Sequence, residues 1–241
     1  YGWQTTYVIS AVVYFCIAFP IAFLIKESPL REVARNNPEV EVRDFPLSER
    51  EVIIWISMAI IFCCNCMAVP IVHLVPLLTD NGRTLDEATT VLTLLMFSGA
   101  FGRIVGGKLG DTIGALPGYI LMSGGQTISV LWFPYFHSDL SLYLLAIVFG
   151  FTYSGVMSSI LVCTRTMVSA RYSGRAMSIT SFFGWIGMGT GGVVGGLLFD
   201  ATGNYDWSFS FAAGVGVINL IILGLFFVRI RTQGALSPVT A

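Results

Sequence analysis

The chain has 241 residues, of which 55% are apolar and only 11% are charged, and its formal net charge is −1. Its mean hydropathy of +0.78 excludes an ordinary soluble domain, and the near-neutral charge gives no support for nucleic-acid binding. Runs of 18 or more apolar residues recur, and each is long enough to cross a bilayer core about 30 Å thick. The sequence therefore predicts an all-α membrane protein.

Seven membrane-spanning helices are predicted along the chain. The first covers Gln4–Ile25, with a kink expected at Pro20. A charged segment, Lys26–Glu51, follows, and its mixed charges and three prolines are typical of a linker. The other six spans are Val52–Leu78, which Pro70 and Pro76 are expected to interrupt, Leu85–Leu109, Leu116–Phe136, Leu140–Cys163, Ala176–Phe199 and Ser208–Val228.

The basic residues orient these spans, because cytoplasmic loops carry an excess of Lys and Arg. If Lys26–Glu51 is cytoplasmic, 12 of the 13 basic residues fall on that side and only Arg83 falls outside. The C-terminus is then cytoplasmic as well. The protein is expected in the cell inner (plasma) membrane.

An internal repeat relates the two halves of the six-span region. The segment Gly106–Gly114, GGKLGDTIG, matches Gly195–Gly203, GGLLFDATG, 89 residues later. That offset equals three spans and their loops, so the second copy has the opposite orientation in the membrane. Three helices followed by three inverted helices are typical of secondary transporters. Each copy also has small residues every four positions that allow close helix packing: Gly102, Gly106 and Gly110, then Gly187, Gly191 and Gly195.

We therefore divide the chain into three parts. Residues 1–25 are interpreted as the last helix of an N-terminal half, residues 26–51 as a cytoplasmic linker between the halves, and residues 52–241 as the six-helix C-terminal half. The chain has no initiator Met and opens with Tyr1-Gly-Trp3 directly before an apolar run. We interpret it as a fragment of a longer, twelve-helix protein.

Arg103 is the residue of the spans that most suggests a function. It lies eight residues before Asp111, which places it about 12 Å along the helix from the following loop. A charge at that depth is costly and usually faces a cavity or a partner. The residues alone leave two interpretations open, namely binding of a substrate or snorkelling to the cytoplasmic interface.

Three segments resemble a known family. Gly102–Gly114, GRIVGGKLGDTIG, resembles the signature loop of the major facilitator superfamily in its second-half copy, between helices eight and nine. His73–Asp80 and Gly196–Tyr205 resemble the monocarboxylate and oxalate/formate branch. The resemblance covers essentially the whole chain. It implies helices six to twelve of a secondary transporter that moves a small organic anion by alternating access.

The resemblance also implies roles for single residues. In that branch an arginine of helix eight binds the substrate carboxylate, and Arg103 has the matching spacing. We therefore favour carboxylate binding, for which a guanidinium is suited because its fork can pair two oxygens. The lysine of helix eleven found in oxalate exchangers has no counterpart in Ala176–Phe199, which favours a monocarboxylate over a dicarboxylate. The mid-span residues Asn65, Tyr153 and Trp185 either line the pathway or serve ordinary helix packing.

The signature loop implies a gate, to which we assign Gly102, Gly106, Asp111 and Gly114. Asp111 can pair with a cytoplasmic arginine, Arg165 or Arg175, in one state and release it in the other, unless it is a plain turn residue. His73 is the one ionisable group of its span, and is either a proton carrier or a polar residue near the outer interface. Proton symport and substrate exchange both stay open.

Other classes are less compatible with the sequence. Cys63, Cys64 and Cys66 point to different sides of one helix, so we expect buried thiols and no metal site. The spans lack the paired carboxylates or HExxH motif of an intramembrane enzyme, and no cofactor is predicted. A non-transporting receptor or scaffold on the same fold stays the alternative function. The expected partners are the organic anion, the bilayer lipid and the missing N-terminal half of the protein.

Overall fold

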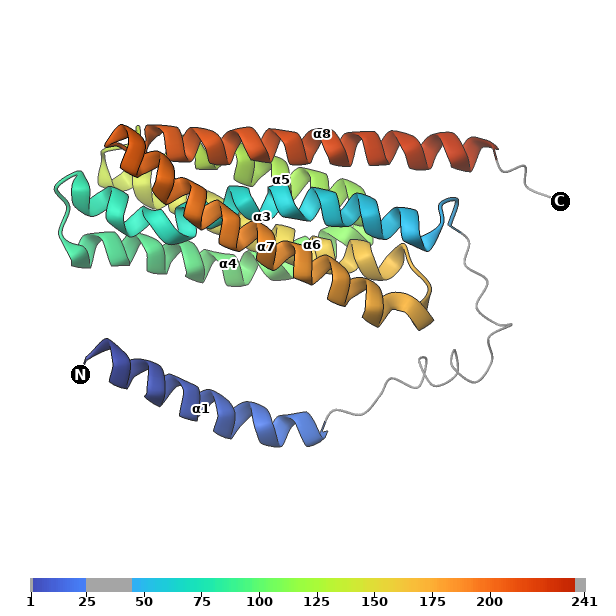
Figure 1. The fold of residues 1–241 in the computed structure, drawn as a ribbon, viewed down its shortest axis with the longest axis horizontal. Helices are drawn as coiled ribbons and strands as arrows, with labels where there is room; N and C mark the ends of the chain where they lie inside the picture. The colour runs from blue at the N-terminus through green and yellow to red at the C-terminus, as the bar shows by residue number, and fades with distance from the viewer. Residues whose placement is uncertain (1, 25–44, 237–241) are drawn as a thin grey trace. The chain divides into compact units, whose positions relative to one another are not determined.

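The computed structural model describes residues 2–24 and 45–236, and all regular structure within them is helical. The chain divides into two compact units, residues 1–42 and residues 43–241. The first unit contains α1 (Trp3–Leu24), and the second contains the remaining helices (Figure 1). These are α3 (Glu49–Asp80), α4 (Leu85–Ile113), α5 (Ala115–Val130), α6 (Asp139–Thr166), α7 (Ala170–Thr202) and α8 (Asp206–Leu236).

Local sequence signals explain where these helices begin and end. Thr84 caps α4 in a reciprocal arrangement, because its hydroxyl accepts a hydrogen bond from the Glu87 N–H and the Glu87 carboxylate accepts one from the Thr84 N–H. Ser48 caps α3 and Ser138 caps α6, each through a hydroxyl that accepts a hydrogen bond from the N–H three residues further on. Gly203 ends α7 with a φ of 72°, a left-handed conformation that glycine adopts without strain.

The all-α membrane architecture predicted from the sequence is confirmed. Six helices of the described residues are long and apolar enough to cross a bilayer, namely α1, α3, α4, α6, α7 and α8. Most of them extend several residues beyond the predicted spans, since a helix continues through the polar interface. Most of the expected linker lies outside the described residues, but its last three residues already belong to α3, which starts at Glu49.

Two predictions about helix continuity were wrong. The span predicted over Leu116–Phe136 is helical only to Val130, so α5 has 16 residues. An uninterrupted helix would need a hydrogen bond from the N–H of residue 134 to the Val130 carbonyl, and Pro134 has no N–H to donate. The chain continues in turns after Val130. Conversely, α3 continues without a break through Pro70 and Pro76. Prolines are tolerated in membrane helices where neighbouring groups satisfy the freed backbone.

The helix contacts reproduce the internal repeat. Within the second unit, α4 packs on α6 as α7 packs on α3, and α5 packs on α6 as α8 packs on α3. The first helices of the two triplets, α3 and α6, run in opposite directions (Figure 1). The unit is therefore built from two inverted three-helix repeats, or triplets, as the repeated glycine motifs predict. The first triplet is α3, α4 and α5, and the second is α6, α7 and α8.

The glycine stripes make the two equivalent helix contacts possible. A Cβ atom at Gly102 would overlap the backbone oxygen of Phe151 on α6, and one at Gly106 would overlap that of Gly155. In the other triplet, a Cβ atom at Gly191 would lie 2.7 Å from the backbone oxygen of Asn65 on α3. Only glycine lets the backbones approach this closely.

Polar side chains tie the triplets together at both ends of the unit. At one end, the Glu49 carboxylate accepts hydrogen bonds from the N–H of Ser169, at 3.0 Å, and from its hydroxyl. At the other end, Arg83 forms an ion pair with Asp139 at 2.5 Å. In each case the loop inside one triplet contacts the first helix of the other triplet. We call these two contacts the Glu49 clasp and the Arg83 clasp.

We expect Glu49→Ala to lower the stability of the six-helix unit by about 2 kcal/mol, because it removes a charged acceptor from two partly buried donors. Thermal unfolding of the purified protein measures this effect. Glu51→Ala is the matched control, since its ion pair with Arg229 is partly exposed and such pairs contribute about 0–1 kcal/mol. Equal losses for the two variants would contradict a stabilising role of the Glu49 clasp.

Candidate substrate site

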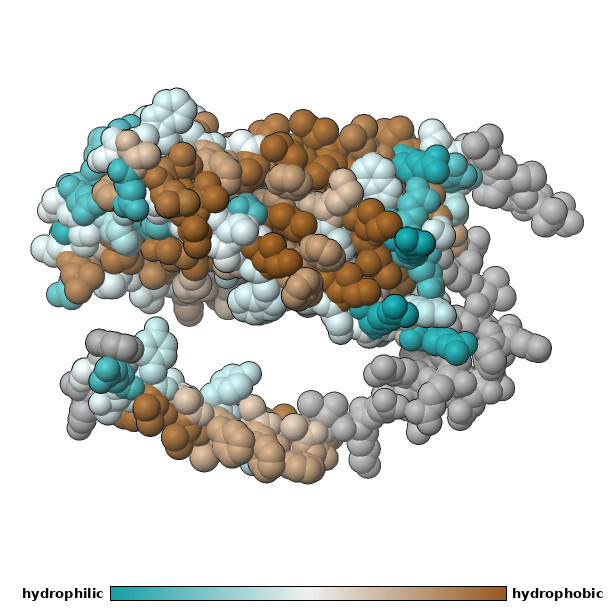
Figure 2. Space-filling view, in the orientation of Figure 1, coloured by the Kyte–Doolittle hydropathy of each residue, from teal (hydrophilic) through white to brown (hydrophobic). Residues whose placement is uncertain are grey.

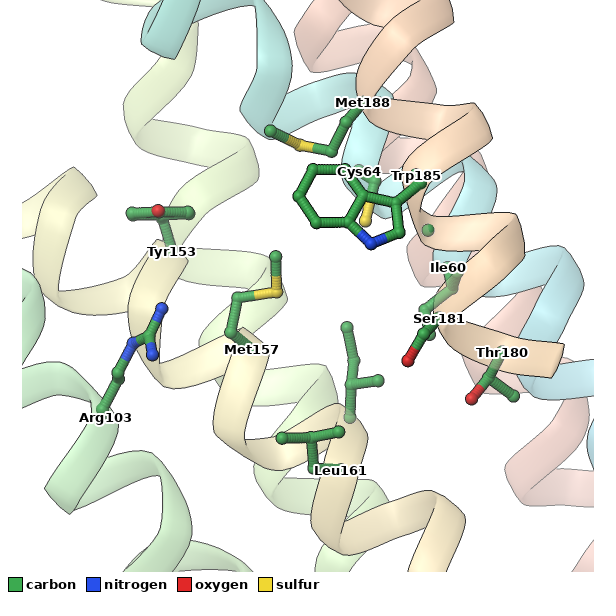
Figure 3. A pocket seen from close by; sticks show the side chains of 12 residues that line it. Ile60, Cys64, Arg103, Tyr153, Met157, Leu161, Thr180, Ser181, Trp185 and Met188 are labelled. Atoms are coloured by element: carbon green, nitrogen blue, oxygen red, sulfur yellow. The ribbon is translucent and has the colours of Figure 1, made fainter. Parts of the chain in front are cut away.

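A cavity of about 370 Å³ lies between α3, α4, α6 and α7 of the second unit. Three of the residues predicted to bind substrate line it together, namely Arg103, Tyr153 and Trp185 (Figure 3). They come from three different helices, α4, α6 and α7. The packing of the two triplets against each other therefore brings these residues into one space.

Helical spacing explains how the walls are formed. Tyr153, Met157 and Leu161 recur every four residues along one face of α6. Ser181 and Trp185 present the facing side of α7. Since most of these side chains are apolar, the cavity is a largely apolar space with a few polar groups, which is the usual composition of a small-molecule site.

Arg103 supplies the positive charge of this cavity. It lies ten residues before the end of α4, or about 15 Å along the helix. Within residues 2–24 and 45–236 it has no hydrogen-bond or ion-pair partner. None of the described lining residues is acidic. A guanidinium without an intramolecular counter-ion is available to an external anion, and its fork matches a carboxylate.

Asn65 does not line this cavity. Its side chain is 7% exposed, and its amide donates to the Ile61 carbonyl at 2.9 Å and to the Thr190 hydroxyl at 3.1 Å. The contact with Thr190 joins α3 to α7. The structure thus places Asn65 in the helix interface, and its predicted part in substrate binding stays a prediction.

His73 also lies in the contact between α3 and α7. Its Nε2 is 2.9 Å from the Gly192 carbonyl, which can only accept, so Nε2 carries the proton. Its ring lies 5.7 Å from that of Tyr205. Burial, together with the carboxylates of Asp80 and Asp200, raises the pKa of Tyr205. The predicted proton carrier is therefore held by a specific hydrogen bond.

The predicted gating residues lie at the end of α4 and nearby. Gly114 joins α4 to α5 with a φ of 97°, which a residue with a side chain adopts only with strain. Asp111 is exposed and, among the described residues, forms no ion pair with Arg165 or Arg175. The switching pair predicted from the signature loop is thus not formed in this structure.

The sequence analysis missed several lining residues. Thr180 and Ser181 place hydroxyl groups on the α7 wall, and Cys64 contributes its thiol from α3 although it is 2% exposed. In Ala176–Phe199 the sequence analysis predicted only Trp185 as a substrate-binding residue, so these hydroxyl groups were not predicted. The recurrence of Ser181 one turn before Trp185 is the signal that could have indicated them.

These observations define an integral, multi-pass membrane protein built from inverted triplets, with a cavity to which the described residues contribute one free cation, Arg103. A sequence model of the Major Facilitator Superfamily matches residues 54–240, and the chain belongs to this family. It is 32% identical over 169 residues to monocarboxylate transporter 13 of Rattus norvegicus, covering 66% of this chain and 38% of that protein. It is 26% identical over 225 residues to the uncharacterized MFS-type transporter YcxA of Bacillus subtilis, covering 85% of this chain and 52% of that protein.

The comparisons confirm the predicted resemblance to the superfamily. The names of both relatives describe transporters and not enzymes, and one of them names monocarboxylates. The chain spans about half the length, or less, of these curated relatives.

Proposed function

We propose that the protein of which this chain is part is a secondary transporter that moves a small organic anion, most simply a monocarboxylate, by alternating access. The observation that carries the proposal is the free guanidinium of Arg103 in a largely apolar cavity beside Tyr153 and Trp185. In this proposal Arg103 pairs the carboxylate, and the apolar walls accept the rest of the molecule. A single cation matches a single negative charge, which favours a monocarboxylate over a dicarboxylate.

The arrangement of the whole protein belongs to the same proposal. Residues 1–25 form the last helix of an N-terminal half, residues 26–51 the linker and residues 52–241 the C-terminal half. The end of the second unit at which α3 begins and α8 ends faces the cytoplasm, because the basic residues gather there. The C-terminus is then cytoplasmic and the membrane is the plasma membrane. Asp111 and Arg165, with the glycines of the signature loop, form the cytoplasmic gate.

The experiment that tests this proposal is uptake by the full-length protein in liposomes. We expect saturable uptake of a labelled monocarboxylate such as lactate or pyruvate, with competition by other monocarboxylates and not by their amides, which lack the charge. Specific binding without flux would instead support the alternative of a receptor or scaffold on a transporter fold. If the protein shows no flux and no binding of any carboxylate, the proposed substrate class is contradicted.

The proton-carrier role of His73 has its own test. We expect His73→Gln to preserve thermal stability, since the Gln amide can donate to the Gly192 carbonyl in place of Nε2. If His73 carries the proton, this variant loses the pH dependence of uptake but retains exchange of substrate for substrate. Unchanged pH dependence in a folded His73→Gln protein would move proton coupling to the substrate or to the other half.

A further inference from the structure

A second hollow, which shares no lining residue with the substrate cavity, lies along α3 and α7. In Figure 1 the separation between α7 and α8 widens toward the end at which α7 begins, and α3 is visible between them. Two cavities lie along this stretch of α3 and α7, with volumes of about 190 Å³ and 460 Å³. They share Ile53, Ile54 and Ile179, so they form one continuous groove, which we call the α3–α7 groove.

The groove has an apolar part and a basic part. Towards the middle of the helices its walls are Met58, Ile61 and Phe183 together with the shared isoleucines. At the end where α3 and α7 begin, Arg50, Arg175 and the Tyr172 ring line it. Figure 2 shows the same change across this face, from hydrophobic residues over the middle of the unit to hydrophilic ones at its end.

The charge at the basic end is not neutralised within the described residues. Neither Arg50 nor Arg175 has an ion-pair partner there. Among the described residues that line this end, Glu49 is the one carboxylate, and it already accepts two hydrogen bonds from Ser169. Two guanidinium groups are therefore available to an anionic group at the membrane interface.

The apolar part contains one unsatisfied polar group. Ser57 lines it with a side chain that is only 5% exposed, and its hydroxyl has no hydrogen-bond partner among the described residues. A buried donor without an acceptor costs free energy, so a ligand that offers a carbonyl oxygen at this place is favoured. Ser57 lies seven residues beyond Arg50, or about 10 Å along α3.

We propose that the α3–α7 groove binds one anionic phospholipid from the leaflet next to the start of α3. Its phosphate pairs with Arg50 and Arg175, an acyl chain lies along the isoleucines, Met58 and Phe183, and an ester carbonyl accepts from Ser57. A lipid matches this combination because it joins a negative headgroup to a long apolar chain. The site is separate from Arg103 and does not depend on which substrate is transported.

The test is native mass spectrometry of the full-length protein in detergent, titrated with phosphatidylglycerol or phosphatidylcholine. We expect one phosphatidylglycerol to bind preferentially, and the double variant Arg50→Gln/Arg175→Gln to bind it roughly 25-fold more weakly, from about fivefold for each arginine near an anionic lipid. Lys108→Gln is the matched control, because it removes an exposed basic residue at the same end but outside the groove. Both arginines are exposed, so the double variant should unfold at the temperature of the unmodified protein.

A groove-filling variant and two possible outcomes test whether binding of the lipid is specific. Ile179→Trp fills the shared part of the groove, and we expect it to weaken binding of phosphatidylglycerol while both arginines remain. The proposal is overturned if phosphatidylcholine binds as tightly as phosphatidylglycerol, or if Lys108→Gln weakens binding as much as the double variant. Either outcome would leave only non-specific lipid around the helices.

Discussion

Arg103→Ala should reduce uptake by the full-length protein at least about 30-fold while leaving its thermal stability unchanged. A hydrogen bond to a charged group contributes about 1.5–3 kcal/mol, and the proposed bidentate pair between Arg103 and the carboxylate contains two of them. Stability should not fall, because Arg103 has no intramolecular ion pair or hydrogen bond within the described residues. Uptake into liposomes measures the loss of transport, and thermal unfolding of the same preparation measures the stability.

Two variants separate the roles of charge and geometry. Arg103→Lys keeps the positive charge but loses the planar fork, so we expect partial uptake with a raised KM. Lys108→Gln removes a positive charge from the same helix, five residues further on and outside the cavity, and should transport normally. Near-normal uptake by a folded Arg103→Ala protein would remove Arg103 from the substrate site and support the snorkelling interpretation.

Gly102→Ala should destabilise the six-helix unit by about 3 kcal/mol or more. The added methyl group would overlap the backbone oxygen of Phe151, which cannot rotate away as a side chain does, so α4 and α6 must separate. Overpacking of a close contact typically costs about 1–3 kcal/mol, and a clash with backbone lies at the upper end. The melting temperature of the purified protein and its yield in monodisperse form are the measurements.

The matched control is Gly107→Ala on the same helix. Its Cβ atom would meet nothing within 4 Å, and Ala is favoured over Gly inside a helix by about 1 kcal/mol. Its stability should therefore be unchanged or slightly higher. Gly191→Ala, which occupies the equivalent contact of the other triplet, should resemble Gly102→Ala. An equal loss of stability in Gly107→Ala and Gly102→Ala would contradict the role of close packing at Gly102.

Most of the fold could be predicted from the sequence, because a bilayer imposes long apolar runs and the positive-inside rule. The repeated motif at Gly106 and Gly195 was enough to predict inverted triplets, since its offset fixes both order and direction. The failures were local. The effect of Pro134 on α5, and the tolerance of Pro70 and Pro76 by α3, depend on which neighbouring groups satisfy the backbone, and a hydropathy pattern does not contain this information.

The candidate site could be predicted only in part. Arg103 was evident because a charge inside an apolar run is rare, and Tyr153 and Trp185 were among the mid-span polar or aromatic residues. Asn65 has the same properties in sequence but lies in the α3–α7 contact, because its face of α3 is set by the glycines of α7. Which face of a membrane helix meets a cavity depends on three-dimensional packing, and hydrophobic periodicity is weak where all faces are apolar.

The Glu49 clasp and the Arg83 clasp also constrain the motion of transport. Each joins the two triplets, and they do so at opposite ends of the six helices, so a tilt of one triplet against the other is expected to break one of them. Spin labels placed on α3 and α6 should therefore keep a constant separation throughout the transport cycle. In the proposed alternating access, we therefore expect the six-helix unit to rotate largely as one body relative to the proposed N-terminal half.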